Sequence, residues 1–343
     1  MLTKLDMKIL LDTARERMKG FCSLCQVCDG RACAGKMPGM GGAITGSSFT
    51  ANSHALADIR LNMRVVHECI DPDTHFEFFG SSLATPIMNG PMAGPNSNCG
   101  PIDDLEFEVA LLKGTTQAGS LGWIGDPARE EFFMNGCKAI EEAGTGVVIS
   151  KPHYDNANVR LRFQWGKDAG ATAFGMDLDG AGILHLKTLG YPVGPKSVQA
   201  LKIIRSFMPS NPFIIKGIMT ADDALRCRDA GVDCIVVSNH GGRVLDGTPG
   251  VAEVLPEIAK AVGNDMVILA DGAVRSGVDV LKYLALGAKA VLVGRPLCWG
   301  VYGGSAEGVK LIIDTYTEQL KQAMILTGCK DLSDINSRIL FGF

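Results

Sequence analysis

Short apolar runs alternate along the second half of the chain with segments of helical spacing. Each run ends on a polar residue or a glycine, and the four runs lie at 213–217, 234–238, 266–271 and 290–295. The intervening segments carry apolar residues every three to four positions, at 221–230, 252–262 and 278–286. Parallel strands are buried on both faces, so they appear in a sequence as continuous apolar runs between helices. The pattern therefore predicts successive βα units.

The same alternation continues through the first half of the chain. Further strands are predicted at 86–90, 121–124, 147–150 and 173–177, and helices at 105–118, 128–143 and 157–169. Together with the four later runs, this makes eight strands, which is the number that closes a TIM barrel. We therefore predict an α/β fold consisting of a single TIM (β/α)8 barrel.

The N-terminal part does not follow this alternation. It is expected to contain an amphipathic helix, a glycine-rich loop, a second helix and a short strand, at 5–19, 35–46, 55–65 and 77–80. We expect residues 1–80 to form a helical, Cys- and Gly-rich extension that caps a barrel made by residues 81–343. The glycine-rich loop either covers the mouth of the site or is a linker. A C-terminal helix at 306–326 has an apolar face typical of packing on a barrel.

Composition narrows the class of protein. The chain has 343 residues, of which 46% are hydrophobic, and a net charge of -4. One barrel of about 250 residues plus an extension accounts for this length. The mild acidity does not support nucleic-acid binding, and no apolar run reaches the roughly 18 residues of a membrane span. The N-terminus lacks the apolar core of a signal peptide, so we expect a cytoplasmic protein. We also expect its substrate to be a small molecule.

Charged residues and one histidine stand at the ends of the later strands, where an eightfold barrel carries its reactive groups. They are Lys216, His240, Asp271, Arg275 and Arg295. Arginines combined with glycine amides at a helix N-terminus hold phosphate well, and Gly272, Gly277 and Gly294 provide the glycines. A histidine can act as a base near neutral pH. The rim therefore predicts a catalytic site with a phosphate-binding part.

Several blocks of this half resemble one enzyme family. They are Lys216, Ser238-Asn239-His240-Gly241-Gly242-Arg243, Asp271-Gly272-Ala273-Val274-Arg275-Ser276-Gly277 and Gly294-Arg295-Pro296. Together they resemble the FMN-dependent 2-hydroxyacid oxidase and dehydrogenase family, the relatives of glycolate and lactate oxidase. The resemblance covers residues 212 to about 335. It implies FMN as cofactor, oxidation of a 2-hydroxy acid to the 2-oxo acid, and a homo-oligomer, in this family a tetramer.

The resemblance also implies roles for single residues. His240 would be the base, Arg243 would grip the substrate carboxylate with its planar fork, and Lys216 would stabilise the reduced flavin. The residues expected to contact FMN are Pro91, Met92, Ala93, Lys216, Ser238, Asp271, Gly272, Arg275, Gly294 and Arg295.

The chain departs from this family at the expected substrate contacts. No tyrosine precedes Tyr154, so two tyrosines that the family places on the substrate are missing, and Lys151 stands at the second position. The second carboxylate-binding arginine is also missing from the loop at 180–194, which contains His185, Lys187 and Tyr191. Lys151 either binds an anion or faces solvent. The departures put glycolate and lactate in doubt and leave a different carboxylate or a phosphate-bearing substrate open. Trp123 is expected to pack in the barrel.

Four cysteines lie close together near the N-terminus, at Cys22, Cys25, Cys28 and Cys33. Two-residue gaps let thiolates converge on zinc or an iron-sulfur cluster, and a cluster would give a one-electron route to the flavin. The alternative is that they pack in a capping segment, as buried thiols often do. Eleven cysteines without an export signal suggest a reducing compartment.

Two other functions remain open. The approach to the first strand, at 79–86, faintly resembles type 2 isopentenyl diphosphate isomerase, an FMN barrel that lacks the His-Gly-Gly-Arg motif. A flavin protein that transfers electrons through the cysteine segment is the other alternative.

Overall fold

The computed structural model describes residues 5–127, 129–183, 186 and 190–342. Its central sheet has eight parallel strands: β3 (Ile87–Asn89), β4 (Trp123–Ile124), β5 (Val147–Ser150), β6 (Ala173–Asp177), β7 (Phe213–Ile218), β8 (Cys234–Val237), β9 (Val267–Ala270) and β10 (Ala290–Val293). Strands follow one another in chain order from β4 to β10, and β10 pairs with β3. The predicted TIM barrel is confirmed, with strand bounds close to those expected.

One side chain completes the ring between β3 and β4. The Asn89 amide donates to the carbonyl oxygen of Trp123 at 2.7 Å, and its oxygen accepts the Trp123 N–H at 2.9 Å. A parallel bridge between Met92 and Ile124 continues the pairing. The Asn89 side chain thus makes the hydrogen bonds to the Trp123 backbone that a neighbouring strand would otherwise make.

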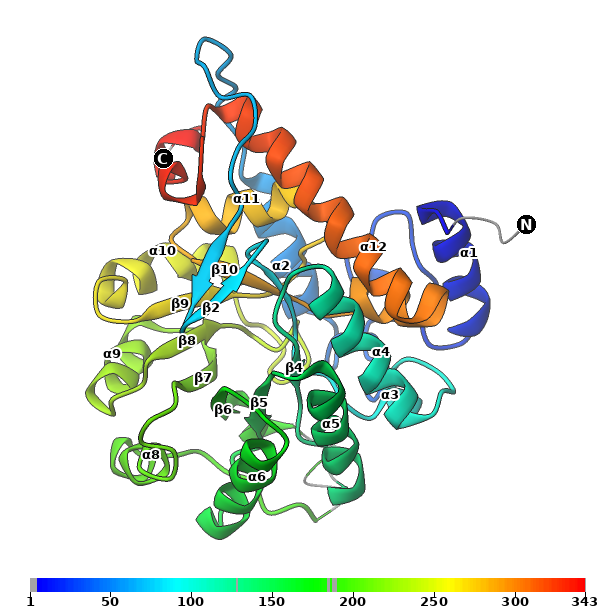
Figure 1. Cartoon of the computed structure of the whole chain (residues 1–343), viewed down its shortest axis with the longest axis vertical. Helices are drawn as coiled ribbons and strands as arrows, with labels where there is room; N and C mark the ends of the chain where they lie inside the picture. Colours follow the sequence, from blue (N-terminus) through cyan, green and yellow to red (C-terminus); the bar gives the residue numbers. More distant parts are fainter. Residues whose placement is uncertain (1–4, 128, 184–185, 187–189, 343) are drawn as a thin grey trace.

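Helices surround the barrel (Figure 1). They are α3 (Pro95–Asn98), α4 (Asp104–Gln117), α5 (Glu130–Ala143), α6 (Asn156–Asp168), α8 (Val198–Arg205), α9 (Ala221–Asp229), α10 (Val251–Val262), α11 (Gly277–Ala285) and α12 (Arg295–Thr327). Serine, threonine or aspartate caps several of them by accepting a hydrogen bond from the first turn, as Ser276 does for α11 and Thr220 for α9. None of the helices in the described ranges is long and apolar enough to span a membrane.

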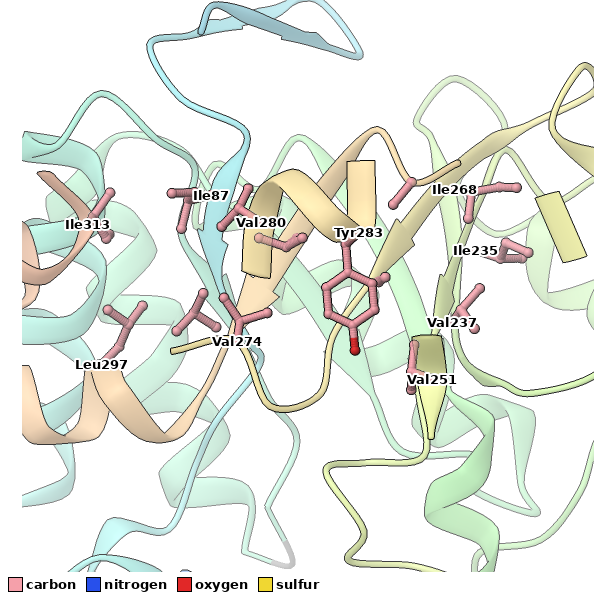
Figure 2. Packing of buried hydrophobic residues seen from close by; sticks show 14 of the residues in the cluster. Ile87, Ile235, Val237, Val251, Ile268, Val274, Val280, Tyr283, Leu297 and Ile313 are labelled. Carbon is pink, nitrogen blue, oxygen red and sulfur yellow. The ribbon is translucent and has the colours of Figure 1, made fainter. Parts of the chain in front are cut away.

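The main hydrophobic core lies between the strands and these helices. Ile235 and Ile268 of the sheet belong to it, as does Tyr283 of α11, and Figure 2 labels all three. Tyr283 is fully buried, and its hydroxyl donates to the carbonyl oxygen of Gly272 at 2.8 Å. Burying a large apolar side chain stabilises the fold by about 1.5–3 kcal/mol. The buried Tyr283 therefore also fixes the loop after β9 through its hydrogen bond to Gly272.

A second, smaller core fills the barrel. It includes Trp123, Ile214 and Leu269, and the hairpin of β1 (Phe76–Phe78) and β2 (Ser81–Leu83) adds Phe78 and Leu83. The Phe78 and Trp123 rings lie 6.2 Å apart. Trp123 is fully buried, which confirms its predicted packing role. The hairpin, cyan near the centre of Figure 1, covers the N-terminal end of the barrel, so the opposite end carries the cavity.

The N-terminal part packs on the barrel helices. Helix α1 (Met7–Arg17) buries Leu10 and Ala14 and lies beside α12 (Figure 1). The predicted helix at 55–65 is wrong, because α2 (Ser47–Asp58) ends earlier. The following residues are extended and pair with the C-terminus: the Phe341 N–H donates to the carbonyl oxygen of Arg60 at 2.9 Å. This long-range pairing overrides the local helical pattern.

Helix α12 is longer than expected. It begins at Arg295 and has non-helical backbone at Gly304 and Ser305, after which it follows the predicted span.

Candidate active site

A cavity of about 610 Å³ lies at the C-terminal ends of the strands. This volume is within the usual range for ligand sites. Nearly all of the predicted site residues line it: Pro91, Met92, Ala93, Lys151, Lys216, His240, Arg243, Asp271, Gly272, Arg275, Gly294 and Arg295. Ser238 lies beside it, hydrogen-bonded to two of them. The folded chain therefore brings together residues from β3 to β10.

His240 follows β8 in a left-handed conformation, with φ of 57°. Its Nδ1 lies 3.1 Å from both carboxylate oxygens of Asp179. This contact orients the ring and leaves Nε2 as the nitrogen that can take up a proton. Burial lowers the pKa of His240, against the opposing effect of Asp179. The imidazole is therefore neutral near pH 7, the form that a base requires.

Asp179 was missed by the sequence analysis. It lies in a 3-10 turn, Leu178–Gly182, directly after β6. Gly217 in β7 leaves room for it, because a Cβ on Gly217 would lie 2.5 Å from the Asp179 Cγ. Although burial alone would raise it, His240 and Lys216 lower the pKa of Asp179 below its usual range. The only signal in the sequence was a second carboxylate two positions after Asp177.

Lys216, Ser238 and Asp271 form a chain of contacts across three neighbouring strand ends. The Lys216 ammonium donates to Ser238 Oγ at 2.9 Å, and Ser238 donates to Asp271 Oδ2 at 2.8 Å. Lys216 Nζ also lies 3.3 Å from the same Asp271 oxygen. Burial opposes the charge on Lys216, but nearby carboxylates, Asp271 first, outweigh it and raise its pKa. Lys216 therefore keeps its positive charge inside the cavity.

Lys151 faces the cavity, with 12% of its side chain exposed, and forms an ion pair with Asp177. The Lys151 N–H donates to Asp126 Oδ2 at 2.9 Å, which positions the residue at the end of β5. Burial raises the pKa of Asp177, although Lys151 acts in the opposite direction. The solvent-facing alternative for Lys151 does not hold.

Three arginines gather at one side of the cavity. Arg243 donates to the carbonyl oxygen of Gly39 and to Asn98 Oδ1, the latter at 2.7 Å. Arg295 donates to the carbonyl oxygens of Met40 at 2.7 Å and Gly241 at 3.1 Å. In the described ranges, neither they nor Arg275 has a carboxylate partner within ion-pair distance. Burial, followed by the charges of Arg243 and Arg275, lowers the pKa of Arg295. This uncompensated positive charge suits an anionic ligand.

The glycine-rich loop covers this side of the cavity. Met37, Pro38 and Met40 line it. The loop is anchored by Asp246, whose carboxylate accepts hydrogen bonds from the Thr45 N–H at 2.8 Å and the Ser47 N–H at 2.9 Å. Of the two alternatives for this loop, the structure therefore favours a position at the mouth of the site.

The other loop of interest, at 180–194, is only partly described. His185 and Lys187 lie outside the described residues. Ile183 and Leu186 line the cavity, while the Tyr191 hydroxyl accepts a hydrogen bond from Arg162 at 2.8 Å.

Comparison with known proteins agrees with this architecture. A profile described as FMN-dependent dehydrogenase matches residues 39–181 and 192–341. The chain belongs to the FMN-dependent dehydrogenase family. A 4-hydroxymandelate oxidase from Amycolatopsis orientalis is 30% identical over 85% of this chain and 89% of its own length. An L-lactate oxidase from Lactobacillus jensenii is 32% identical over 83% of this chain and 75% of its own.

A crystal structure of mandelate oxidase superposes with a TM-score of 0.75 at 29% identity, covering 96% of this chain and 98% of the other. The chain is therefore an enzyme of the oxidoreductase class. Its relatives are oxidases and dehydrogenases by name, so the isomerase alternative is not favoured.

The cavity fits the cofactor of the family, FMN. Asp271 Oδ1 and Arg275 Nε are buried without a hydrogen-bond partner in the described part of the chain. A Cβ on Gly294 would meet only Met92 Sδ, at 3.8 Å, so a ligand can approach the backbone there. The unpaired Asp271 oxygen can accept a hydrogen bond from a hydroxyl group of FMN. The unpaired Arg275 N–H and the accessible backbone at Gly294 suit its phosphate.

The cysteines divide into two groups. Cys99 and Cys298, which the sequence analysis did not single out, line the cavity with their sulfurs 3.6 Å apart. No three of the four N-terminal cysteine sulfurs lie within 4.8 Å of one another; in the described residues, only Asp177, Asp179 and His240 form such a group. The sulfurs therefore do not form a site for a single metal ion as they stand.

Proposed function

We propose that the protein oxidises a 2-hydroxy acid to the corresponding 2-oxo acid with FMN as electron acceptor. The observation that carries the proposal is the His240–Asp179 pair, whose histidine lines the same cavity as Arg243. The names of the relatives support the substrate class, since they include oxidases of 4-hydroxymandelate, L-lactate and 2-hydroxyacids.

In this proposal, His240 removes a proton from the substrate at Nε2. Asp179 holds the ring in place and stabilises the imidazolium that forms, as a buried carboxylate does for a histidine base. Arg243 turns its guanidinium fork from Gly39 and Asn98 to the substrate carboxylate. Bound FMN supplies the two-electron acceptor.

The cofactor contacts follow from the same geometry. Arg275, Arg295 and the Gly272 and Gly294 backbone would hold the phosphate, with Asp271 on the ribityl chain. Pro91, Met92 and Ala93 follow β3 and would lie against the flavin ring, and Ser238 fixes Lys216 beside it. Lys216 keeps its charge and would stabilise negative charge on the reduced cofactor.

Lys151 would select the substrate. It is the cationic side chain that stands where the family has a tyrosine, and it lines the cavity while paired with Asp177. An anionic group on the substrate would compete with Asp177 for Lys151. We infer a 2-hydroxy acid with a second anionic group, carboxylate or phosphate. Homo-oligomer formation as a tetramer, a cytoplasmic location and a domain boundary near residue 80 remain predictions.

The test is anaerobic reduction of the bound flavin by a panel of 2-hydroxy acids, followed by its visible absorbance. We expect bleaching by at least one acid, and loss of bleaching in His240→Ala with FMN still bound. The matched control is His75→Ala, because His75 pairs with Asp73 at 2.5 Å on the surface, away from the cavity. Full activity in His240→Ala would reject His240 as the base, and a flavin that no acid bleaches would reject the substrate class.

A further inference from the structure

The four N-terminal cysteines differ from the rest in exposure. The other seven are all buried, whereas Cys22, Cys28 and Cys33 are half-buried and Cys25 is exposed. None of the eleven is in a disulfide bond. A packing role explains buried thiols, and it does not explain why an exposed thiol and three half-buried ones lie within twelve residues.

One backbone N–H near these cysteines donates a hydrogen bond to a cysteine sulfur. The Leu24 N–H donates to Cys22 Sγ at 3.5 Å, inside the Cys22-Ser23-Leu24-Cys25 turn. Leu24 has a φ of 43°, which is a costly conformation for a leucine, and its side chain is buried. Hydrogen bonds from backbone N–H groups to the sulfurs are among the features that tune cysteine-bound clusters. In this conformation the Leu24 N–H points at a cysteine sulfur.

The segment from Ser23 to Gly30 is held by side-chain contacts: Leu24 is buried, and Thr50 Oγ1 donates to the carbonyl oxygen of Asp29 at 3.1 Å. No backbone N–H from Ser23 to Gly30, all of them described residues, donates to another backbone carbonyl. A loop with few internal hydrogen bonds costs conformational entropy to order, and a bound metal centre commonly supplies the compensating free energy.

The surroundings provide the positive charge that thiolates need. Arg275 Nη2 lies 3.3 Å from Cys28 Sγ. Arg295, the second arginine on this side, donates to the carbonyl oxygens of Met40 and Gly41, in the loop that follows Cys33. Both arginines also line the cavity.

The four sulfurs are not gathered in the way that a single zinc ion requires. Four thiolates on one zinc ion, with Zn–S bonds of about 2.3 Å, lie about 3.8 Å from one another. The absence of any three of these sulfurs within 4.8 Å argues against that arrangement. In a four-iron cluster each thiolate binds a different iron, so the sulfurs stand farther apart. The sequence spacing is that of a bacterial ferredoxin run with one extra residue before the last cysteine.

We propose that Cys22, Cys25, Cys28 and Cys33 bind a [4Fe–4S] cluster beside the arginine end of the cavity. Its role rests on the function proposed above. With FMN and the cluster bound, the two electrons from each substrate oxidation would pass singly to a one-electron acceptor, in two transfers per turnover, while the protons go to solvent.

The binding test uses the full chain purified without oxygen, and it needs no substrate. Iron, acid-labile sulfide, zinc and FMN are quantified, and an electron paramagnetic resonance spectrum is recorded after dithionite reduction. We expect about four iron and four sulfide per chain. Cys25→Ser should lose both while keeping FMN, since Cys25 is exposed and its replacement does not disturb the core. The control is Cys69→Ser, whose buried thiol donates to the carbonyl oxygen of Cys329 outside the segment.

Three outcomes would overturn the site: FMN-containing protein that takes up no iron and sulfide on reconstitution, zinc without sulfide, or unchanged iron in Cys25→Ser. The role has its own readout, substrate-driven reduction of cytochrome c, a protein acceptor. It should fall at least tenfold in Cys25→Ser while flavin bleaching by the same acid persists, and an equal rate would reject the electron route. If no 2-hydroxy acid bleaches the flavin of the wild-type protein, the proposed substrate class is rejected. The iron and sulfide measurement of the cluster stays valid in that case.

Discussion

Both carboxylate oxygens of Asp179 lie 3.1 Å from Nδ1 of His240, although the two residues are 61 positions apart. The contact joins the loop after β6 to the loop after β8, across Gly217 of β7. A side chain at position 217 would occupy the space that Asp179 fills. Packing of these barrel loops therefore positions the Asp179 carboxylate against the histidine that is proposed to take the substrate proton.

Asp179→Asn should slow flavin reduction by about 10² to 10³-fold, because the imidazolium loses its stabilising charge. The rate falls as pH drops through the pKa of His240, which burial places below its usual value. Asp179 raises that pKa, so its removal should also move the acidic limb to lower pH. Stopped-flow reduction across pH measures both effects. Asp73→Asn, in the exposed His75 pair, is the control. An unchanged plateau and limb would show that Asp179 has no part in the reaction.

Lys216→Met should destabilise the protein by about 3–5 kcal/mol in urea unfolding, because it leaves the mostly buried Asp271 carboxylate without its cation. FMN content should fall with it. The double variant with Asp271→Asn should regain part of the stability, since the unpaired charge is gone. Lys310→Met breaks an exposed pair with Asp314 and should cost less than about 1 kcal/mol. Equal effects of the two lysine variants would contradict this assignment.

Asp246→Ala should release the glycine-rich loop. It removes hydrogen bonds to Thr45 and Ser47, at a cost of about 1–3 kcal/mol, and should speed proteolysis within residues 35–46. Although burial acts against them, these bonds lower the pKa of Asp246. Their contribution is therefore present above about pH 3.9 and is lost as pH falls through the lower pKa of the folded state. The exposed Asp229→Ala is the control. An unaltered cleavage rate would mean that the loop is held elsewhere.

Glu108→Gln should flatten the dependence of stability on pH. Glu108 is buried on α4 with Oε2 unpaired, and burial raises its pKa well above 4.5. Its contribution is full below the pKa of the unfolded chain and is lost as pH rises through that of the folded state. The wild type should therefore lose up to about 1.4 kcal/mol per pH unit above pH 4.5 from this group. Thermal unfolding from pH 4.5 to 8 should show a shallower decline in the variant, with exposed Glu106→Gln matching the wild type. Parallel curves for Glu108→Gln and the wild type would refute the assignment.

The pattern of apolar residues predicted strand bounds best where a strand is buried on both faces. Strands β5 and β6 have the predicted bounds, because continuous apolar residues between helices mark a strand covered on both faces. The helix expected at 55–65 failed because Leu61 pairs with Leu340, which no local pattern announces.

The sequence by itself therefore determined the barrel, the rim that carries Lys216, His240 and Arg243, and the unusual cysteine spacing, since each follows from residues near one another in the chain. Only the tertiary structure decided that Asp179 reaches His240, that Lys151 meets Asp177 and that Cys28 lies against Arg275. The physical reason is that these contacts join loops from separate strands and from the N-terminal segment. Their geometry depends on barrel closure and on which neighbouring side chains leave space.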